Sequence, residues 1–237
     1  MRIVVLESSP NRHGSSNLLA DHFIRGAQEA GHTVEVLDAA HAHLHPCNGC
    51  VRCGYEGSCV QKDDMETFRT KLLAADMVVF VTPLYYFGMS AQLKILIDRF
   101  CAFNSSLNRR HLKSALLVSA WNQDNWTFDA LVHHYQTLVH YLNLEDHGMI
   151  LGAGCGTVSM TRHSPGLPPG AEPKVRQAVL QKIQRIGSVS CPQKEFAEII
   201  GLIASGMIDP EKYVTEVQAL EQQTDPQAPM VKFVIRP

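Results

Sequence analysis

Short apolar segments alternate with amphipathic helical segments through residues 1–187, and this alternation constrains the fold more than any other feature. Apolar, largely β-branched runs predict five strands, at Arg2–Leu6, Thr33–Leu37, Met77–Val81, Ala115–Val118 and Met149–Leu151. Apolar residues at helical spacing predict helices at Ser16–Ala30, Asp63–Ala74, Ser90–Ala102, Phe128–Leu142 and Glu172–Ile186. Strands that alternate with helices form a parallel sheet with right-handed crossovers. The sequence therefore predicts a three-layer α/β sandwich.

The end of the sequence lacks the regular alternation of strands and helices and predicts an extension to this α/β domain. It contains two short helical segments, Gln193–Ala204 and Glu211–Gln222, and then a strand-like segment, Val231–Ile235. We therefore divide the chain into a domain over residues 1–187 and a C-terminal extension over residues 188–237. A chain of 237 residues is long enough to bury a stable core without disulfide bonds.

The charge balance excludes one large class of partner. Lys and Arg number 21 against 23 Asp and Glu, which gives a formal net charge of −2. Nucleic-acid binding needs a broad basic surface, so we expect no nucleic-acid partner. No apolar stretch approaches the roughly 18 residues that cross a membrane, and Met1–Leu6 is too short for a signal peptide. We expect a cytoplasmic protein with no membrane span, in which the seven cysteines stay reduced.

A polar loop joins the first strand to the first helix and could bind an anion. It reads Ser8-Ser9-Pro10-Asn11-Arg12-His13-Gly14-Ser15-Ser16-Asn17 and contains neither a Gly-x-Gly-x-x-Gly nor a Walker pattern. Backbone N–H groups and the helix dipole favour an anion at such a helix start. Hydroxyl groups and an arginine can add donors and charge, which suits a terminal monophosphate. The alternative is an ordinary capped helix in a polar loop.

Two more loops follow the third and fourth strands, at the edge of the sheet where open α/β folds bind ligands. The first contains Pro83, Leu84 and three consecutive aromatic residues, Tyr85, Tyr86 and Phe87. Three aromatic side chains in a row cannot all point inward, so at least one is available to a flat ligand. The alternative is an aromatic cluster that covers the sheet edge. The second loop, Ser119–Asn125, contains Trp121 and Asn122.

These loops resemble those of the NAD(P)H-dependent FMN reductase branch of the flavodoxin-like superfamily. The first is similar to the Ser-Pro-Arg-x-x-Gly-Asn-Thr loop that holds the FMN phosphate, with Asn11 in place of Arg and Ser15-Ser16 in place of Asn-Thr. Residues 83–99 match the family pattern Pro-x-Tyr-x-x-x-x-Ser-x-x-Leu-Lys-x-x-x-Asp-Arg. The resemblance covers about residues 1–187 and implies a flavodoxin-like fold with a five-stranded parallel sheet in the order 2-1-3-4-5. It implies an FMN site formed by Ser9, Arg12, Ser15, Ser16, Asn17, Pro83, Leu84, Tyr85, Tyr86, Phe87, Trp121 and Asn122.

Four cysteines lie close together between the second strand and the second helix. Cys47, Cys50, Cys53 and Cys59 have the spacing Cys-x2-Cys-x2-Cys-x5-Cys, which can supply four thiolates to zinc or to an iron–sulfur cluster. The motif resembles that of the iron–sulfur flavoproteins of the same family, which implies a [4Fe-4S] cluster. Structural thiols, a zinc site and a redox disulfide remain alternatives. The isolated Cys101, Cys155 and Cys191 are expected to be packing residues.

The functional hypothesis is an FMN-dependent NAD(P)H oxidoreductase that reduces a quinone, a flavin or another small electron acceptor. The flavin carries the chemistry, so we expect no catalytic side chain. One alternative is an iron–sulfur flavoprotein in which a four-cysteine cluster exchanges electrons with FMN, and another is a binding module that has lost the flavin. The expected partners are a nicotinamide nucleotide and a small acceptor. We expect a homo-oligomer, since flavin sites of the family commonly lie at a subunit boundary.

Overall fold

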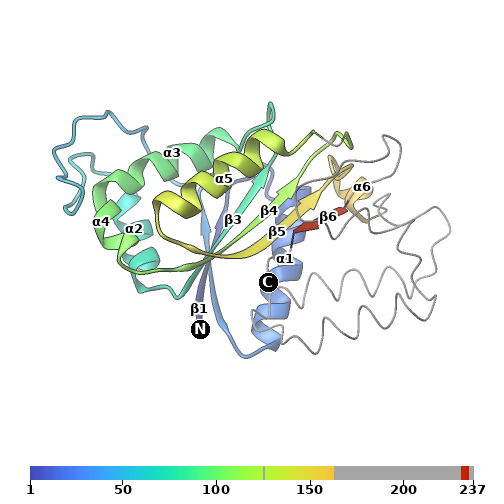
Figure 1. Cartoon of the computed structure of the whole chain (residues 1–237), viewed down its shortest axis with the longest axis horizontal. Helices are drawn as coiled ribbons and strands as arrows, with labels where there is room; N and C mark the ends of the chain where they lie inside the picture. The colour runs from blue at the N-terminus through green and yellow to red at the C-terminus, as the bar shows by residue number, and fades with distance from the viewer. Residues whose placement is uncertain (125, 163–230, 235–237) are drawn as a thin grey trace.

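The computed structural model describes residues 1–124, 126–162 and 231–234, which form a twisted sheet covered by helices (Figure 1). The sheet has six strands in the order β2-β1-β3-β4-β5-β6, and neighbours among the first five are parallel. This order confirms the predicted flavodoxin-like topology 2-1-3-4-5. The strands are β1 (Arg2–Glu7), β2 (Thr33–Asp38), β3 (Met77–Pro83), β4 (Lys113–Ser119), β5 (Glu145–Gly152) and β6 (Val231–Val234).

Helices cover both faces of the sheet. Helix α1 packs on one face, whereas α2, α3 and α5 pack on the other (Figure 1). The helices are α1 (Ser15–Glu29), α2 (Met65–Ala74), α3 (Ala91–Arg99), α4 (Asn104–Asn108), α5 (Asp129–Tyr141) and α6 (Val158–Arg162), with a 3-10 turn η1 (Phe100–Phe103) between α3 and α4.

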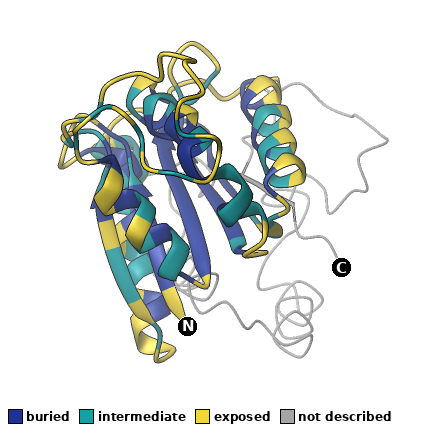
Figure 2. Ribbon diagram, turned by 90° about the vertical axis from the view of Figure 1, so that its left-hand side faces the viewer, coloured by how far each residue is buried: buried dark blue, intermediate teal, exposed yellow. Residues whose placement is uncertain are grey.

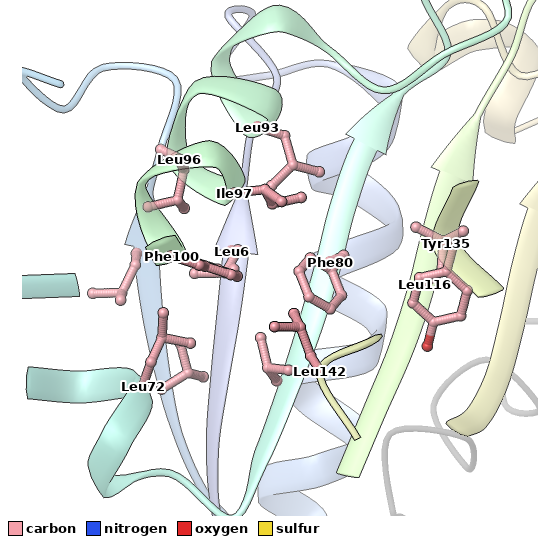
Figure 3. Packing of buried hydrophobic residues seen from close by; sticks show 14 of the residues in the cluster. Leu6, Leu72, Phe80, Leu93, Leu96, Ile97, Phe100, Leu116, Tyr135 and Leu142 are labelled. Atoms are coloured by element: carbon pink, nitrogen blue, oxygen red, sulfur yellow. The ribbon is translucent and has the colours of Figure 1, made fainter. Parts of the chain in front are cut away.

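The two-residue period of the strands divides the core into two parts. In β1, Ile3 and Val5 face α1 and pack with Phe23, whereas Val4 and Leu6 face the opposite layer. Figure 3 shows this second layer, where Leu93 and Leu96 of α3 and Phe80 of β3 meet Leu6. All seven residues of β3 are buried, as expected for a central parallel strand.

Several elements differ from the sequence prediction, three of them in ways that have a clear physical reason. The helix expected over Ser90–Ala102 ends at Arg99 and continues as η1 and then α4, which the helical spacing did not separate. Strand β5 begins at Glu145, four residues before the apolar run that marked it, because the backbone pairs with β4 where the side chains are polar. The terminal strand-like segment is β6, which adds an antiparallel sixth strand to the five that we predicted.

Several predictions lie outside the described residues. These are the helices at Glu172–Ile186, Gln193–Ala204 and Glu211–Gln222, the domain boundary after residue 187, and Cys191. Figure 2 shows that, within the described part, the central strands are buried, while exposed residues collect on the edge strand β2, in the loops and on the outer helix faces. In this part no helix has the length and apolar character to cross a membrane.

Candidate functional site

The loop between β1 and α1 is a compact turn. The Ser9 hydroxyl accepts a hydrogen bond from the Asn11 N–H at 3.3 Å, and the Gly14 N–H donates to the Asn11 carbonyl at 2.9 Å. A Cβ atom added at Gly14 would lie 3.0 Å from the Asn11 carbonyl oxygen and 3.1 Å from Ser9 Oγ. Glycine at this position therefore lets the loop close tightly at the start of α1.

Helix α1 begins without a side-chain cap. Gly14 occupies the N-cap position, so the first N–H groups of this 15-residue helix keep their capacity to bind an anion. The Ser15 hydroxyl is buried and has no hydrogen-bond partner within the described part of the chain. The Ser16 hydroxyl, in contrast, shares a 2.7 Å hydrogen bond with Ser119 Oγ. A buried donor without a partner is costly, and a phosphate oxygen would satisfy it.

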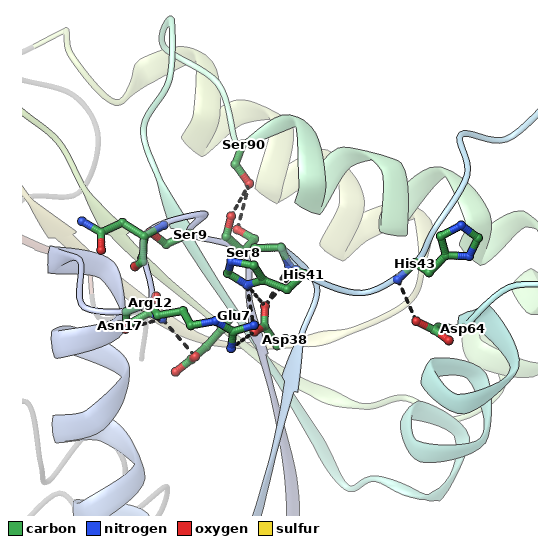
Figure 4. Close-up of polar contacts among 12 residues, drawn as sticks. Glu7, Ser8, Ser9, Arg12, Asn17, Asp38, His41, His43, Asp64 and Ser90 are labelled. Atoms are coloured by element: carbon green, nitrogen blue, oxygen red, sulfur yellow. Dashed lines mark hydrogen bonds and ion pairs between the residues drawn. The ribbon is translucent and has the colours of Figure 1, made fainter.

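The other two predicted phosphate-loop residues have protein partners (Figure 4). Arg12 Nη1 lies 2.8 Å from an Asp38 carboxylate oxygen and is exposed, so contact with a phosphate would need the side chain to swing away. Asn17 Nδ2 donates to Glu7 at 3.1 Å and to the Arg12 carbonyl at 3.3 Å. The structure thus places the serine hydroxyls, rather than Arg12, at the start of the helix.

Glu7 adds a titratable group that the sequence analysis did not identify. Burial at the end of β1, followed by repulsion from Asp21 and Asp38, raises the pKa of Glu7 to about 7. Its carboxyl group accepts the Asn17 hydrogen bond described above (Figure 4). The charge state of the strand end beside the phosphate loop therefore changes near neutral pH.

The aromatic loop after β3 ends in a tight reverse turn. The Tyr85 N–H donates to the Gly88 carbonyl at 3.0 Å, and the Gly88 N–H donates to the Tyr85 carbonyl at 3.1 Å. Tyr86 and Phe87 occupy the two central positions with φ of 46° and 64°, the left-handed geometry of a hairpin turn that usually takes Asn-Gly. Tyr86 is fully exposed. Such strain in bulky residues is found mainly at functional sites.

Hydrogen bonds join the three predicted loops into one structure. Ser90 Oγ lies 3.0 Å from the Ser8 carbonyl and 2.9 Å from Ser8 Oγ (Figure 4), which ties the aromatic loop to the phosphate loop. The Leu84 N–H donates to the Ser119 carbonyl at 2.8 Å. Ser119 also holds Ser16, so residues that follow β1, β3 and β4 meet at one edge of the sheet. Pro83 is buried in this framework.

The loop after β4 contributes a residue that we did not predict. The Trp126 ring lies 4.9 Å from the Phe87 ring, centroid to centroid, and thus supports the aromatic turn. Predicted Trp121 is exposed and lies over Gly156, while the predicted Asn122 uses its carbonyl to accept from the Gly154 N–H. The sequence signal for Trp126 was an aromatic residue directly after the predicted loop Ser119–Asn125. Its contact with Phe87 depends on the fold.

The four motif cysteines line one pocket but do not form a ligand set. Cys47 and Cys50 are exposed, Cys53 and Cys59 are half-buried, and Cys101 joins them in the pocket wall. In the described residues, no three His, Cys, Asp or Glu side chains are grouped closely enough to hold a metal ion. The thiols as arranged therefore do not fit a tetrahedral metal or a cluster.

Cys101, expected to be a packing residue, is partly buried and lies in the wall of the cysteine pocket. Its carbonyl oxygen lies 3.8 Å from Cys53 Sγ. Burial, together with the nearby Cys53 and Cys47, raises the pKa of Cys101 to about 11. The sequence could not show this proximity because Cys101 lies 48 positions after Cys53.

A buried ion pair anchors the cysteine loop, which we define as residues 45–62. Arg99 contacts both carboxylate oxygens of Asp63 at 2.6 and 3.0 Å and donates to the His45 carbonyl at 2.7 Å. The two side chains are 1% and 0% exposed. Burial alone raises the pKa of Asp63, but hydrogen bonds from Arg99 and from the backbone of His45 and Met65 outweigh it and lower the pKa to about 2. Arg99 also lines the same pocket as Cys59.

The sequence of residues 1–150 matches the NADPH-dependent FMN reductase family. Because the match covers more than half of the chain, the chain belongs to this family. An iron-sulfur flavoprotein of Methanocaldococcus jannaschii is 35% identical over 99 residues, 42% of this chain and 51% of that protein. An iron-sulfur flavoprotein of Archaeoglobus fulgidus is 31% identical over 99 residues, 42% of this chain and 45% of that protein. The chain thus spans about half the length of these curated relatives.

A longer match is to the YwqN protein of Bacillus subtilis, named as an NAD(P)H-dependent FMN-containing oxidoreductase. It is 25% identical over 166 residues, 65% of this chain and 86% of that protein. Among solved structures, an NAD(P)H:quinone oxidoreductase from Methanothermobacter marburgensis superposes with a TM-score of 0.58 at 20% identity, over 79% of this chain and 94% of that one. At this identity the superposition shows the shared flavodoxin-like fold.

Proposed function

We propose that the protein is an FMN-dependent NAD(P)H oxidoreductase that reduces a small planar acceptor such as a quinone or a free flavin. The observation that carries this proposal is the buried, unpartnered hydroxyl of Ser15 at the uncapped start of α1. It lies on a loop that hydrogen bonds link to the aromatic loop and to the loop after β4. Family membership supports the same cofactor.

The phosphate end of FMN would be held by this chain's backbone and hydroxyl groups. The N–H groups of the first turn of α1 and the Ser15 hydroxyl donate to phosphate oxygens, and Ser9 and Ser16 fix the loop around them. Arg12 is available as an additional charge only when it leaves Asp38. Neutral donors and a helix start suffice for a monophosphate, so no metal is needed there.

The ring of FMN would lie against the aromatic loop. When bound, FMN supplies hydride transfer from the nicotinamide to the acceptor. The chain's own contribution is to position the flavin ring and to exclude water from it. Pro83 and Leu84 form the base of the loop, and Phe87 packs against Trp126. The exposed Tyr86 and Trp121 offer flat apolar surfaces, which favours a planar acceptor.

The test combines binding and turnover on the full chain. Protein reconstituted with FMN under anaerobic conditions should retain the flavin through gel filtration. Addition of NADPH or NADH should bleach the flavin band, and a quinone should restore it. Retained FMN without bleaching by either nucleotide would contradict the oxidoreductase proposal, and failure to retain FMN would contradict the site itself.

The second candidate function is an iron–sulfur flavoprotein. Support comes from Cys47, Cys50, Cys53 and Cys59, which line one pocket, and from sequence relatives named as iron-sulfur flavoproteins. Metal ligation would need the cysteine loop to rearrange, because the thiols do not converge as they stand. Iron and acid-labile sulfide, measured after anaerobic purification of the wild type and of Cys50→Ala, test this function. Iron near zero in the wild type would contradict it.

A homo-oligomer is part of the same proposal. Trp121, Trp126 and Tyr86 are exposed around the candidate site, and exposed aromatic groups of this kind favour a partner surface. Light scattering on the FMN-loaded protein measures the state directly. A mass of 26.3 kDa, that of one chain, would contradict an oligomer.

A further inference from the structure

Cys101 lies in the wall of the cysteine pocket although the sequence motif does not include it. It belongs to η1, whose neighbouring residues Phe100 and Phe103 are buried in the core, so its position is fixed by the fold. Cys53 Sγ lies 3.8 Å from the Cys101 carbonyl oxygen, and both cysteines line the same pocket. A half-buried thiol of the motif and a cysteine of the η1 turn therefore lie in the wall of one pocket.

We propose that Cys53 and Cys101 form a reversible disulfide in the metal-free protein, with a low-molecular-weight disulfide as the oxidant. A disulfide needs the two Cβ atoms about 3.5–4.5 Å apart, and a Cys53 sulfur that lies 3.8 Å from the Cys101 backbone brings the two residues near that range. This site is independent of the FMN site proposed above. It differs from the four-cysteine motif because one of its two sulfurs comes from outside that motif.

Contacts beyond the cysteines hold the two segments together. The Ser105 N–H donates to the Tyr55 carbonyl at 3.3 Å, and Arg109 forms an ion pair with Glu56 at 2.8 Å. Both contacts join the segment that follows Cys53 to the segment that follows Cys101. Within the turn, the Gly57 N–H donates to the Cys53 carbonyl at 2.8 Å, which fixes the backbone at Cys53 itself. The pairing therefore does not depend on the thiols alone.

The chemistry is a two-step thiol–disulfide exchange. The Cys53 thiolate attacks one sulfur of the small disulfide, which forms a mixed disulfide and releases one small thiol. Cys101 then attacks the Cys53 sulfur, loses its proton to solvent and releases the second small thiol. The protein loses two electrons and two protons, and one small disulfide becomes two small thiols. Exposed Cys47 and Cys50 border the pocket, so the oxidant can reach Cys53 from solvent.

The experiment uses the full, metal-free chain with oxidised glutathione as the probe. The protein is reduced, treated with chelator, exposed to oxidised glutathione, alkylated, digested and mapped by mass spectrometry. We expect the loss of two alkylatable thiols per chain and a cross-linked peptide that joins Cys53 to Cys101. Dithiothreitol should restore both thiols. FMN retention and circular dichroism, measured on the same samples, report whether each variant is folded.

Two serine variants separate this pairing from other thiol chemistry. Cys101→Ser should lose the cross-linked peptide and keep a glutathione adduct on the cysteine loop. Cys155→Ser, which removes a buried cysteine after β5, should behave as the wild type. A wild-type protein in which Cys101 remains fully alkylatable after oxidation would overturn the proposal. A cross-link confined to Cys47, Cys50, Cys53 and Cys59 would overturn it as well.

Discussion

The phosphate loop and the cysteine loop both follow strands of the same parallel sheet, yet they are held in opposite ways. The phosphate loop is short and tied along its length, through Ser8 to Ser90 and through Ser16 to Ser119. The cysteine loop is longer, mostly exposed, and anchored at its root by Arg99 and Asp63. The first arrangement is what the proposed FMN site requires, whereas the second suits the thiol–disulfide exchange that we propose.

The largest expected effect tests the anchor of the cysteine loop. Arg99→Met leaves the buried Asp63 carboxylate without its partner, and breaking such a pair costs about 3–5 kcal/mol. Urea unfolding should show this loss. Arg109→Met is the matched control, because its pair with Glu56 is exposed and its loss should cost less than about 1 kcal/mol. Equal effects would mean that the buried pair does not anchor the loop.

The same anchor has a pH signature. The pKa of Asp63, about 2, lies below its ordinary value of 3.8, so the carboxylate form is favoured in the folded state. Its contribution to stability is complete above about pH 4 and is lost as the pH falls from there toward 2. Arg99→Met should reduce the pH dependence of the unfolding free energy over this window. An unchanged slope would contradict the pairing of Arg99 with Asp63 as its cause.

The next effect tests the preorganised loop. Ser15→Ala removes the buried donor that we assign to the FMN phosphate, and a charge-assisted hydrogen bond contributes about 1.5–3 kcal/mol. FMN affinity, measured by flavin fluorescence, should fall about tenfold or more. Ser114→Ala removes another buried hydroxyl at the opposite end of β4 and should leave FMN affinity unchanged. Equal losses of FMN affinity in both variants would contradict the assignment of Ser15 to the phosphate site.

A smaller effect concerns Glu7, beside the phosphate loop. Its folded pKa of about 7 lies above the ordinary 4.5, so stability should fall as the pH rises from about 4.5 to 7 and level off above that. Glu7→Gln should therefore be more stable than the wild type at pH 8, by about 1–2 kcal/mol for this half-buried group, and similar at pH 4.5. Glu35→Gln, in an exposed ion pair, should show no such pH dependence.

The smallest effect tests strain in the aromatic loop. Tyr86→Asn places a residue that tolerates positive φ where a fully exposed tyrosine now sits, so stability should rise by about 0.5–1 kcal/mol. Turnover of a quinone should fall, because the flat surface at the turn is lost. Tyr141→Asn removes an exposed tyrosine from the end of α5 and should bring no gain in stability. A loss of stability in Tyr86→Asn would show that the turn is not strained.

The sequence predicted the features that repeat locally along the chain. Alternating strands and helices yielded the parallel sheet, the resemblance to the family implied its strand order, and the polar loop after β1 located the start of α1. Sequence reasoning missed contacts between distant segments. Nothing near Cys101 marks it as a neighbour of Cys53, and the pairing of Arg99 with Asp63 depends on how α3 crosses the sheet. Likewise, Arg12 was assigned from its charge, whereas Asp38 on the neighbouring strand pairs with it.

Strand β6 also determines how the sheet could be extended by another molecule. The outermost strand of a sheet presents an open row of N–H and C=O groups that a foreign strand can join. Strand β6 pairs with the backbone groups at the free edge of β5, with Val231 opposite Gly152 and Val234 opposite Met149. At the other side, β2 has a neighbour on one flank only within the described residues. Within the described residues β6 is itself an outermost strand, as β2 is, so a foreign strand could be added in parallel or antiparallel pairing at either edge of the sheet.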